Sequence, residues 1–124
     1  MTPSTVLTPT SDHPFDSKEK LKEAKKYDNG KERFDLVPPK PLLMIAEVFT
    51  YGAKKYADRN YLNGNMKWGR VFAAVMRHLW KWWNGEDNDQ ESGLHHLAHA
   101  GAGVMMLLDL LKQKTNDDRP PASK

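Results

Sequence analysis

The sequence contains no cysteine, which excludes both a disulfide framework and a cysteine nucleophile. No apolar run approaches the roughly 20 residues of a membrane span, and the N-terminus lacks the basic and apolar stretches of a signal peptide. A cytoplasmic protein without a membrane partner is therefore expected. Walker A, GxGxxG and HExxH patterns and a His-Asp dipeptide are also missing. P-loop and Rossmann nucleotide sites and two familiar metal-hydrolase motifs are thus not expected.

Charge is unevenly distributed along the 124 residues, whose formal net charge is +3. Residues 41–85 contain two acidic side chains, Glu47 and Asp58, whereas residues 86–91 contain four. A basic middle followed by an acidic stretch suits a phosphorylated ligand bound partly through a cation. The small net charge and the lack of a basic tail disfavour nucleic-acid binding.

The hydrophobic periodicity predicts an all-α fold, a small bundle of about four helices within residues 15–113. We expect a disordered arm at 1–14, a disordered tail at 114–124, and an extended, proline-rich segment at 31–40. The expected helices span residues 16–27, 41–58, 68–84 and 92–113. Because the last helix is apolar around most of its circumference in such a small domain, we expect a homo-oligomer.

An acidic group lies between the last two expected helices. Glu86 and Asp89 have the spacing ExxD, and Glu47 lies in an earlier helix. Mg²⁺ prefers oxygen ligands, often one or two carboxylates together with substrate phosphates. These three residues are therefore the candidate metal ligands, although a solvated acidic loop at a helix N-terminus fits the pattern equally well.

Three histidines follow within five positions, at His95, His96 and His99. On a helix, His99 shares a face with either of the other two. Such spacing occurs in metal ligation and phosphate contact, whereas a lone histidine on an apolar helix is more often a core residue. His78, one helix earlier, joins the group if the two helices pack antiparallel.

A basic and aromatic group occupies the middle of the chain. Lys55, Arg59 and Arg77 are candidate phosphate ligands. Tyr61 or Trp68 could stack on a base, and Asn60 lies beside Tyr61. The alternative is a solvated basic helix face over an aromatic core.

Four segments in this order resemble the N-terminal domain family of phage dATP/dGTP diphosphohydrolases. They are GKERFDLVPP at 30–39, YGAKKYADRNY at 51–61, Trp68 with Arg77-His78-Leu79, and GEDNDQESGLHHLAHA at 85–100. The resemblance covers about residues 30–111. Tyr61 stands where the family usually has Trp. A more distant likeness is to MazG-type all-α pyrophosphatases, whose ExxE element is absent here.

The resemblance implies metal-dependent hydrolysis of a purine deoxynucleoside triphosphate to monophosphate and pyrophosphate, in phage nucleotide metabolism in the host cytoplasm. Mg²⁺ or Mn²⁺ would bind Glu86, Asp89 and Glu47, and the implied catalytic residues are Glu86, His96 and His99. The implied substrate contacts are Arg33, Lys55, Arg59, Asn60, Tyr61, Trp68, Arg77 and His78. The alternative, favoured by the missing ExxE, is a non-catalytic phage protein that sequesters a host signalling nucleotide.

Overall fold

The computed structural model describes residues 24–122 of the chain, which divides into two units, residues 1–33 and 34–124. In the first unit, Lys31 N donates to Asp28 O at 3.1 Å in a turn where Gly30 has a φ of +79°. The expected helix at 16–27 is wrong at residues 24–27, which are not helical. Its remaining residues and the expected arm at 1–14 lie outside the described residues. An isolated helix this short is marginal in water.

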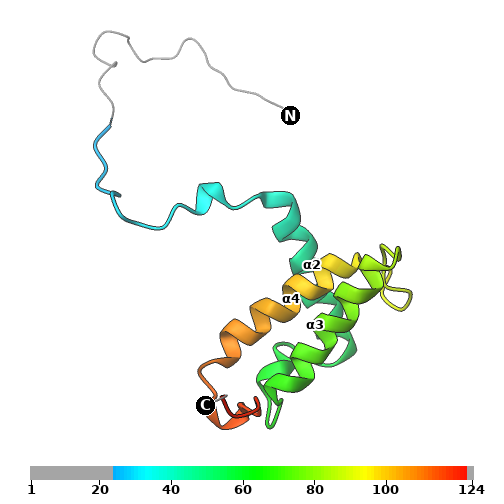
Figure 1. Ribbon diagram of the computed structural model, residues 1–124. Coiled ribbons are helices and arrows are strands. Elements are labelled where there is room, and N and C mark those ends of the chain that lie inside the picture. Colours follow the sequence, from blue (N-terminus) through cyan, green and yellow to red (C-terminus); the bar gives the residue numbers. More distant parts are fainter. Residues whose placement is uncertain (1–23, 123–124) are drawn as a thin grey trace. The chain divides into compact units, whose positions relative to one another are not determined.

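The second unit is all-helical, as predicted (Figure 1). Its α-helices are α2 (Pro39–Lys55), α3 (Trp68–Trp83) and α4 (His96–Leu110). Short 3₁₀ helices occur at Phe34–Leu36, Asn60–Leu62 and Lys114–Asn116. The described residues thus contain three α-helices rather than about four, and no strand beyond an isolated bridge between Asn88 and His95. None of these helices is long and apolar enough to cross a membrane.

Helix α2 begins two residues earlier than predicted, at Pro39. The first turn of a helix tolerates proline because its N–H groups have no partner within the helix. The segment before it, expected to be extended, contains the 3₁₀ turn at Phe34–Leu36. The helix ends at Lys55, before the expected Asp58, and the backbone N–H of Tyr56 caps it by donating to Gly52 O.

Helices α3 and α4 lie side by side and antiparallel (Figure 1). Gly85, with a φ of +101°, follows the end of α3 and lets the chain turn back. Gly103 allows the two helices to approach closely, because a Cβ there would lie 2.4 Å from Cγ2 of Val75. This antiparallel arrangement brings the end of α3 next to the beginning of α4.

Helix α4 begins at His96, four residues later than the predicted Ser92. The loop before it has its own hydrogen bonds, from Gly93 N to Asp89 O and from His96 N to Asp87 O, both 2.8 Å. The His95 side chain then caps the helix by accepting from Leu97 N at 3.0 Å. Local bonds of this kind compete with helix formation, and here they fix the position of the loop.

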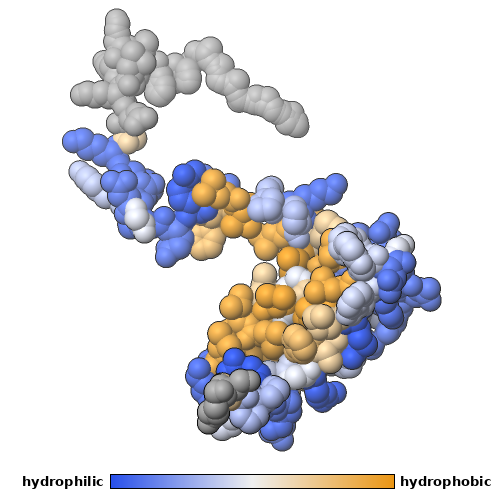
Figure 2. Space-filling model, in the orientation of Figure 1, coloured by the Kyte–Doolittle hydropathy of each residue, from blue (hydrophilic) through white to orange (hydrophobic). Residues whose placement is uncertain are grey.

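Two apolar clusters form the core. Val48 packs with Ala98 and Ala102, and Trp68 packs with Val71 and Leu110, while Met106 touches both clusters. Other large apolar side chains remain on the surface of α3 and α4 (Figure 2). They include Phe72, Val104, Leu108 and Leu111.

The segment from residue 114 differs from the expected disordered tail. Asn116 is buried, and a carboxylate oxygen of Asp118 accepts from Gly69 N at 2.8 Å. The Arg119 guanidinium lies 5.0 Å from the centre of the Trp68 ring. The first N–H groups of a helix lack internal partners and attract negative charge, which explains the position of Asp118 at the start of α3.

Candidate functional site

A cavity of about 400 Å³ opens between α2, α3, α4 and the loops after α2 and before α4. Most of the side chains that the sequence pointed to line it: Lys55, Arg59, Asn60, Tyr61, Arg77, His78, Asp89 and His99. Cations, aromatic rings, imidazoles and a carboxylate thus surround one space.

Lys55 is the cation on the α2 side of the cavity, and it forms an ion pair with Glu91. The Tyr51 hydroxyl donates to the same carboxylate at 2.9 Å. The hydrogen bond to Glu91 raises the pKa of Lys55 above its ordinary value. Neither Tyr51 nor Glu91 was among the predicted site residues. The only signals in the sequence were the place of Tyr51 one turn before Lys55 and that of Glu91 in the acidic stretch.

Arg59 has a φ of +51°, in the left-handed region, and is the one non-glycine residue of the described chain with positive φ. A side chain there costs roughly 1–2 kcal/mol relative to ordinary backbone. Backbone strain of this kind concentrates at functional sites. The strain in Arg59 coincides with its position on the cavity wall.

Tyr61 forms an aromatic wall of the cavity. Its hydroxyl donates to a carboxylate oxygen of Asp109 at 2.8 Å, and its ring centroid lies 6.2 Å from that of Phe49. Burial, together with the bond to Asp109, raises the pKa of Tyr61. The ring is therefore fixed at both its polar end and its apolar face.

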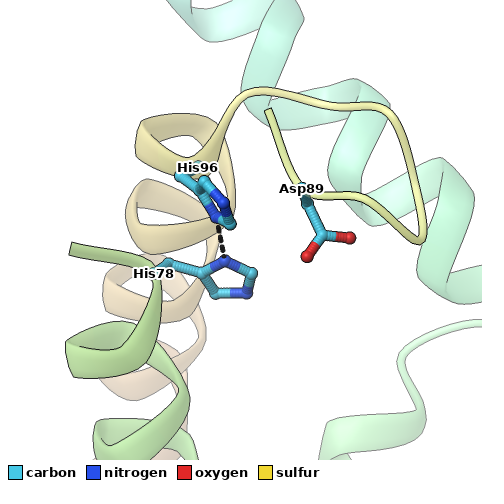
Figure 3. A group of neighbouring side chains, drawn as sticks. All are labelled: His78, Asp89 and His96. Carbon is cyan, nitrogen blue, oxygen red and sulfur yellow. Dashed lines mark hydrogen bonds between the residues drawn. The ribbon is translucent and has the colours of Figure 1, made fainter. Parts of the chain in front are cut away.

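Three histidines, His78, His96 and His99, meet where α3 and α4 adjoin. Figure 3 shows the first two of them. Nδ1 of His78 lies 2.8 Å from Nδ1 of His96, and Nε2 of His96 lies 2.6 Å from a carboxylate oxygen of Glu86. The His78 ring stacks on His99 with centroids 4.4 Å apart and an interplanar angle of 7°. His96 is fully buried.

The imidazoles of His78 and His99 are neutral at pH 7. Burial lowers the pKa of His78 to about 4, and the neighbouring His99 and His96 contribute to the shift. Burial also lowers the pKa of His99. A neutral imidazole has a free lone pair, so it can accept a proton or bind a metal ion.

Asp89 provides the carboxylate nearest to these histidines. Burial favours its neutral form, but hydrogen bonds from Ser92 outweigh burial and lower the pKa of Asp89. One of these bonds, from Ser92 N to Oδ2, measures 2.9 Å. Ser92 was not among the predicted site residues, yet its hydroxyl also lies 2.7 Å from Nε2 of His99. One ligand atom each from His78, Asp89 and His96 lies within 4.8 Å of the others, so this group could bind a metal ion.

Other predicted residues do not line the cavity. Trp68 is buried in the core beneath Arg119. Glu47 is exposed on α2. Glu86 and His96 do not line the cavity either. Glu86 is hydrogen-bonded to His96, and His96 in turn contacts His78, which does line it. Arg33 belongs to the first unit, whereas residues of the second unit alone form the cavity.

Comparison with known proteins gives two matches. The family model described as "dATP/dGTP diphosphohydrolase, N-terminal" matches residues 22–119. A protein of Salmonella phage PMBT28 named dATP/dGTP diphosphohydrolase is 38% identical over 95 residues. The match covers 76% of this chain but 32% of that relative, so the chain spans about a third of the relative's length. No solved structure shows significant similarity.

Proposed function

Because the chain belongs to the dATP/dGTP diphosphohydrolase N-terminal domain family, we propose that its cavity binds and hydrolyses a purine deoxynucleoside triphosphate. The products are the deoxynucleoside monophosphate and pyrophosphate, and the reaction takes place in the cytoplasm of a phage-infected host. One observation gives this proposal its main support: Lys55, Arg59 and Arg77 line the same cavity as His78, Asp89 and His99.

The three cations would bind the triphosphate. Arginine can contact phosphate oxygens with two parallel hydrogen bonds, and lysine acts as a compact point charge. In the structure Lys55 is paired with Glu91, so phosphate binding requires Lys55 to exchange a carboxylate for a phosphate oxygen. The left-handed backbone of Arg59 costs stability. Such strain supports a functional role for the position of its side chain.

Tyr61 and Asn60 would recognise the base. The sequence offered Tyr61 and Trp68 as candidates for stacking on the base. Tyr61 is the better candidate, because its ring lines the cavity whereas Trp68 lies in the core. Purines offer a large π-face for such stacking. The Asn60 amide provides both a donor and an acceptor, the pair that matches the edge of adenine.

His99 would accept the proton of the attacking water at Nδ1, because its imidazole is neutral and lines the cavity, while its Nε2 would donate to the Ser92 hydroxyl 2.7 Å away. The water oxygen bonds to the α-phosphorus, and the bond from that phosphorus to the α,β-bridging oxygen breaks. Pyrophosphate leaves with the electron pair, and the arginines stabilise the charge that develops on the phosphate oxygens. His96 does not suit this role, because both its ring nitrogens already have partners.

A bound divalent cation, Mg²⁺ or Mn²⁺, would neutralise phosphate charge and make water a better nucleophile. The predicted three-carboxylate set for such an ion is not assembled at the cavity. Among Glu47, Glu86 and Asp89, only Asp89 lines it. The group of His78, Asp89 and His96 brings its ligand atoms closer together, and of the two ions it suits Mn²⁺ better than Mg²⁺, which prefers an all-oxygen ligand set.

The alternative is a module that binds a nucleotide, such as a host signalling nucleotide, without chemistry. It is favoured by the extent of the match, which covers only about a third of the phage relative. The catalytic residues of that relative could therefore lie in its unmatched part. The two functions share the cavity and its cations and differ in what happens to the bound ligand.

The experiment is to incubate the chain with a panel of nucleotides, with and without added divalent metal, and to analyse products and bound ligand by mass spectrometry. We expect dATP or dGTP to yield equal amounts of monophosphate and pyrophosphate. Arg77→Gln should abolish turnover and Arg70→Gln, on the same helix but away from the cavity, should not. Stoichiometric recovery of intact nucleotide would support the binding module, and no binding at all would reject both.

We also propose that the chain self-associates through the exposed apolar side chains of α3 and α4. The exposed side chains are Val104 and Leu108 on α4, Leu111 directly after it and Phe72 on α3. Apolar residues gather on this face of the molecule (Figure 2), and large exposed apolar patches mark sites of association.

A further inference from the structure

The hydrogen bonds around His96 define which of its nitrogens carries a proton. An ionised carboxylate only accepts, so the Glu86 carboxylate requires a hydrogen on Nε2 of His96 at 2.6 Å. In the neutral ring, Nδ1 then bears the lone pair. That lone pair is directed at Nδ1 of His78, 2.8 Å away (Figure 3). Two ring nitrogens facing each other at this distance share one proton.

An imidazole that donates one N–H to a carboxylate and has a lone pair on its other nitrogen is the arrangement that orients histidine ligands in metal sites. A metal-bound histidine usually donates its other N–H to a carboxylate, which fixes the ring and makes it a better ligand. Here Glu86 lies behind His96, and on the other side His96 faces His78. Glu86, expected to be a metal ligand itself, is in the position of the orienting carboxylate.

Asp89 completes the donor set. Its carboxylate lies beside the two imidazoles, on the loop before α4 (Figure 3), and accepts a hydrogen bond of 2.9 Å from the backbone N–H of Ser92. Ligand atoms on a first-row metal with bonds of about 2.0–2.1 Å lie roughly 3.4 Å apart at a tetrahedral angle. The atoms here are within 4.8 Å of one another, so small side-chain rotations would bring them to that spacing.

We propose that His78, His96 and Asp89 bind one first-row transition-metal ion, in the class of Mn²⁺, Fe²⁺, Co²⁺ or Zn²⁺, and that Glu86 positions His96 from outside the coordination sphere. The ion takes the place of the proton between His78 and His96. Two nitrogens and one carboxylate oxygen leave coordination positions open on the cavity side, where Asp89 and His78 line the wall. Open positions of this kind accept water or a phosphate oxygen.

This donor set discriminates against Mg²⁺. Magnesium requires nearly octahedral oxygen ligands and seldom takes imidazole, whereas imidazole suits the later first-row metals. The inference rests on the proposed function for the role of the ion in hydrolysis, but ion binding itself can be measured without nucleotide.

The test uses the full chain, stripped of metal with a chelator that is then removed, and titrated with Co²⁺ alone. We expect visible ligand-field absorption that saturates at one ion per chain, disappears on addition of Zn²⁺ and persists in excess Mg²⁺. His78→Ala and Asp89→Asn should abolish the absorption. Glu86→Gln should keep the stoichiometry but weaken affinity by about 10–100-fold. His95→Asn, which removes a neighbouring imidazole and keeps a helix cap, should bind like the parent.

Circular dichroism of each metal-free variant checks that it is folded. If His78→Ala unfolds because its ring packs on His99, Asp89→Asn in the loop provides the same test. Absence of Co²⁺ absorption, or equal absorption in Asp89→Asn and the parent, overturns the site. Unchanged affinity in Glu86→Gln overturns the positioning role. A chain that binds Co²⁺ but leaves dATP and dGTP intact rejects the proposed function alone, and one that hydrolyses them with Mg²⁺ but binds no Co²⁺ rejects this inference alone.

Discussion

Glu86 and His96 are joined by a hydrogen bond of 2.6 Å. Glu86 lies in the loop after α3, and His96 is the first residue of α4. The bond turns the opposite edge of the His96 ring toward His78 on α3. The antiparallel packing of the two helices, made close by Gly103, is what allows this contact. The candidate site therefore depends on the α3–α4 interface.

Replacing Gly103 by alanine should destabilise the fold, because the new Cβ would lie 2.4 Å from Cγ2 of Val75. Overpacking of this kind costs about 1–3 kcal/mol. Gly52→Ala is the matched control, since α2 has open space at that position and alanine stabilises a helix interior by roughly 0.5–1 kcal/mol relative to glycine. Urea denaturation measures both. Equal stability of the two variants would contradict the close helix contact.

Arg59→Gly and Arg59→Ala should separate binding from backbone strain. Both remove a guanidinium from the cavity wall, so both should weaken dATP binding to the same degree. Only glycine relieves the left-handed backbone conformation, and the glycine variant should be more stable than the alanine variant by about 1 kcal/mol. Calorimetric titration and thermal unfolding check the two effects. A difference in nucleotide affinity between the variants would argue that the backbone, not the side chain, makes the contact.

Glu91→Gln should strengthen nucleotide binding several-fold. The change removes a negative charge from the cavity wall and releases Lys55 from its ion pair, so both effects favour a bound phosphate. Glu47→Gln, an equal change of charge on an exposed part of α2 away from the cavity, serves as the control. The measurement is titration with a non-hydrolysable dATP analogue at low salt. Weaker binding in Glu91→Gln than in the control would show that Glu91 itself assists the ligand.

Leu108→Glu should produce a monomer, because it places a charge in the apolar patch of α3 and α4. Leu108 is 65% exposed, so the fold should tolerate the change. Leu43→Glu on α2, where the side chain is 60% exposed, tests whether any exposed leucine has the same effect. Sedimentation velocity of the parent and both variants gives the answer. A parent chain that is already monomeric at micromolar concentration rejects the proposed self-association.

The sequence predicted most closely those elements whose ends have local signals. The predicted start of α3 at Trp68 matches the structure and its end differs by one residue, because turn residues lie on both sides, at Asn63-Gly64 and at Gly85. The predicted start of α4 at Ser92 was wrong, because a serine at this position resembles a helix N-cap in the sequence. In the structure its hydroxyl instead accepts from Leu94 N within the loop and contacts Nε2 of His99 on α4.

Side-chain partners across the fold were harder to foresee. Trp68 and Tyr61 look equivalent as stacking residues in a sequence, and only the packing of α3 on α4 places Trp68 in the core with Leu110. The pairing of Lys55 with Glu91 joins residues 36 positions apart, a contact that neither helical spacing nor composition can indicate. Such pairs depend on tertiary packing.

The most direct test of the proposed hydrolysis follows an isotope from solvent into product. The chain is incubated with dATP or dGTP and a divalent metal in water enriched in the heavy oxygen isotope, and the products are weighed by mass spectrometry. Attack of water at the α-phosphorus predicts one heavy oxygen in the monophosphate and none in the pyrophosphate, with no product from Asp89→Asn. Label in the pyrophosphate or inorganic phosphate, or intact nucleotide after prolonged incubation with the parent chain, would contradict the account.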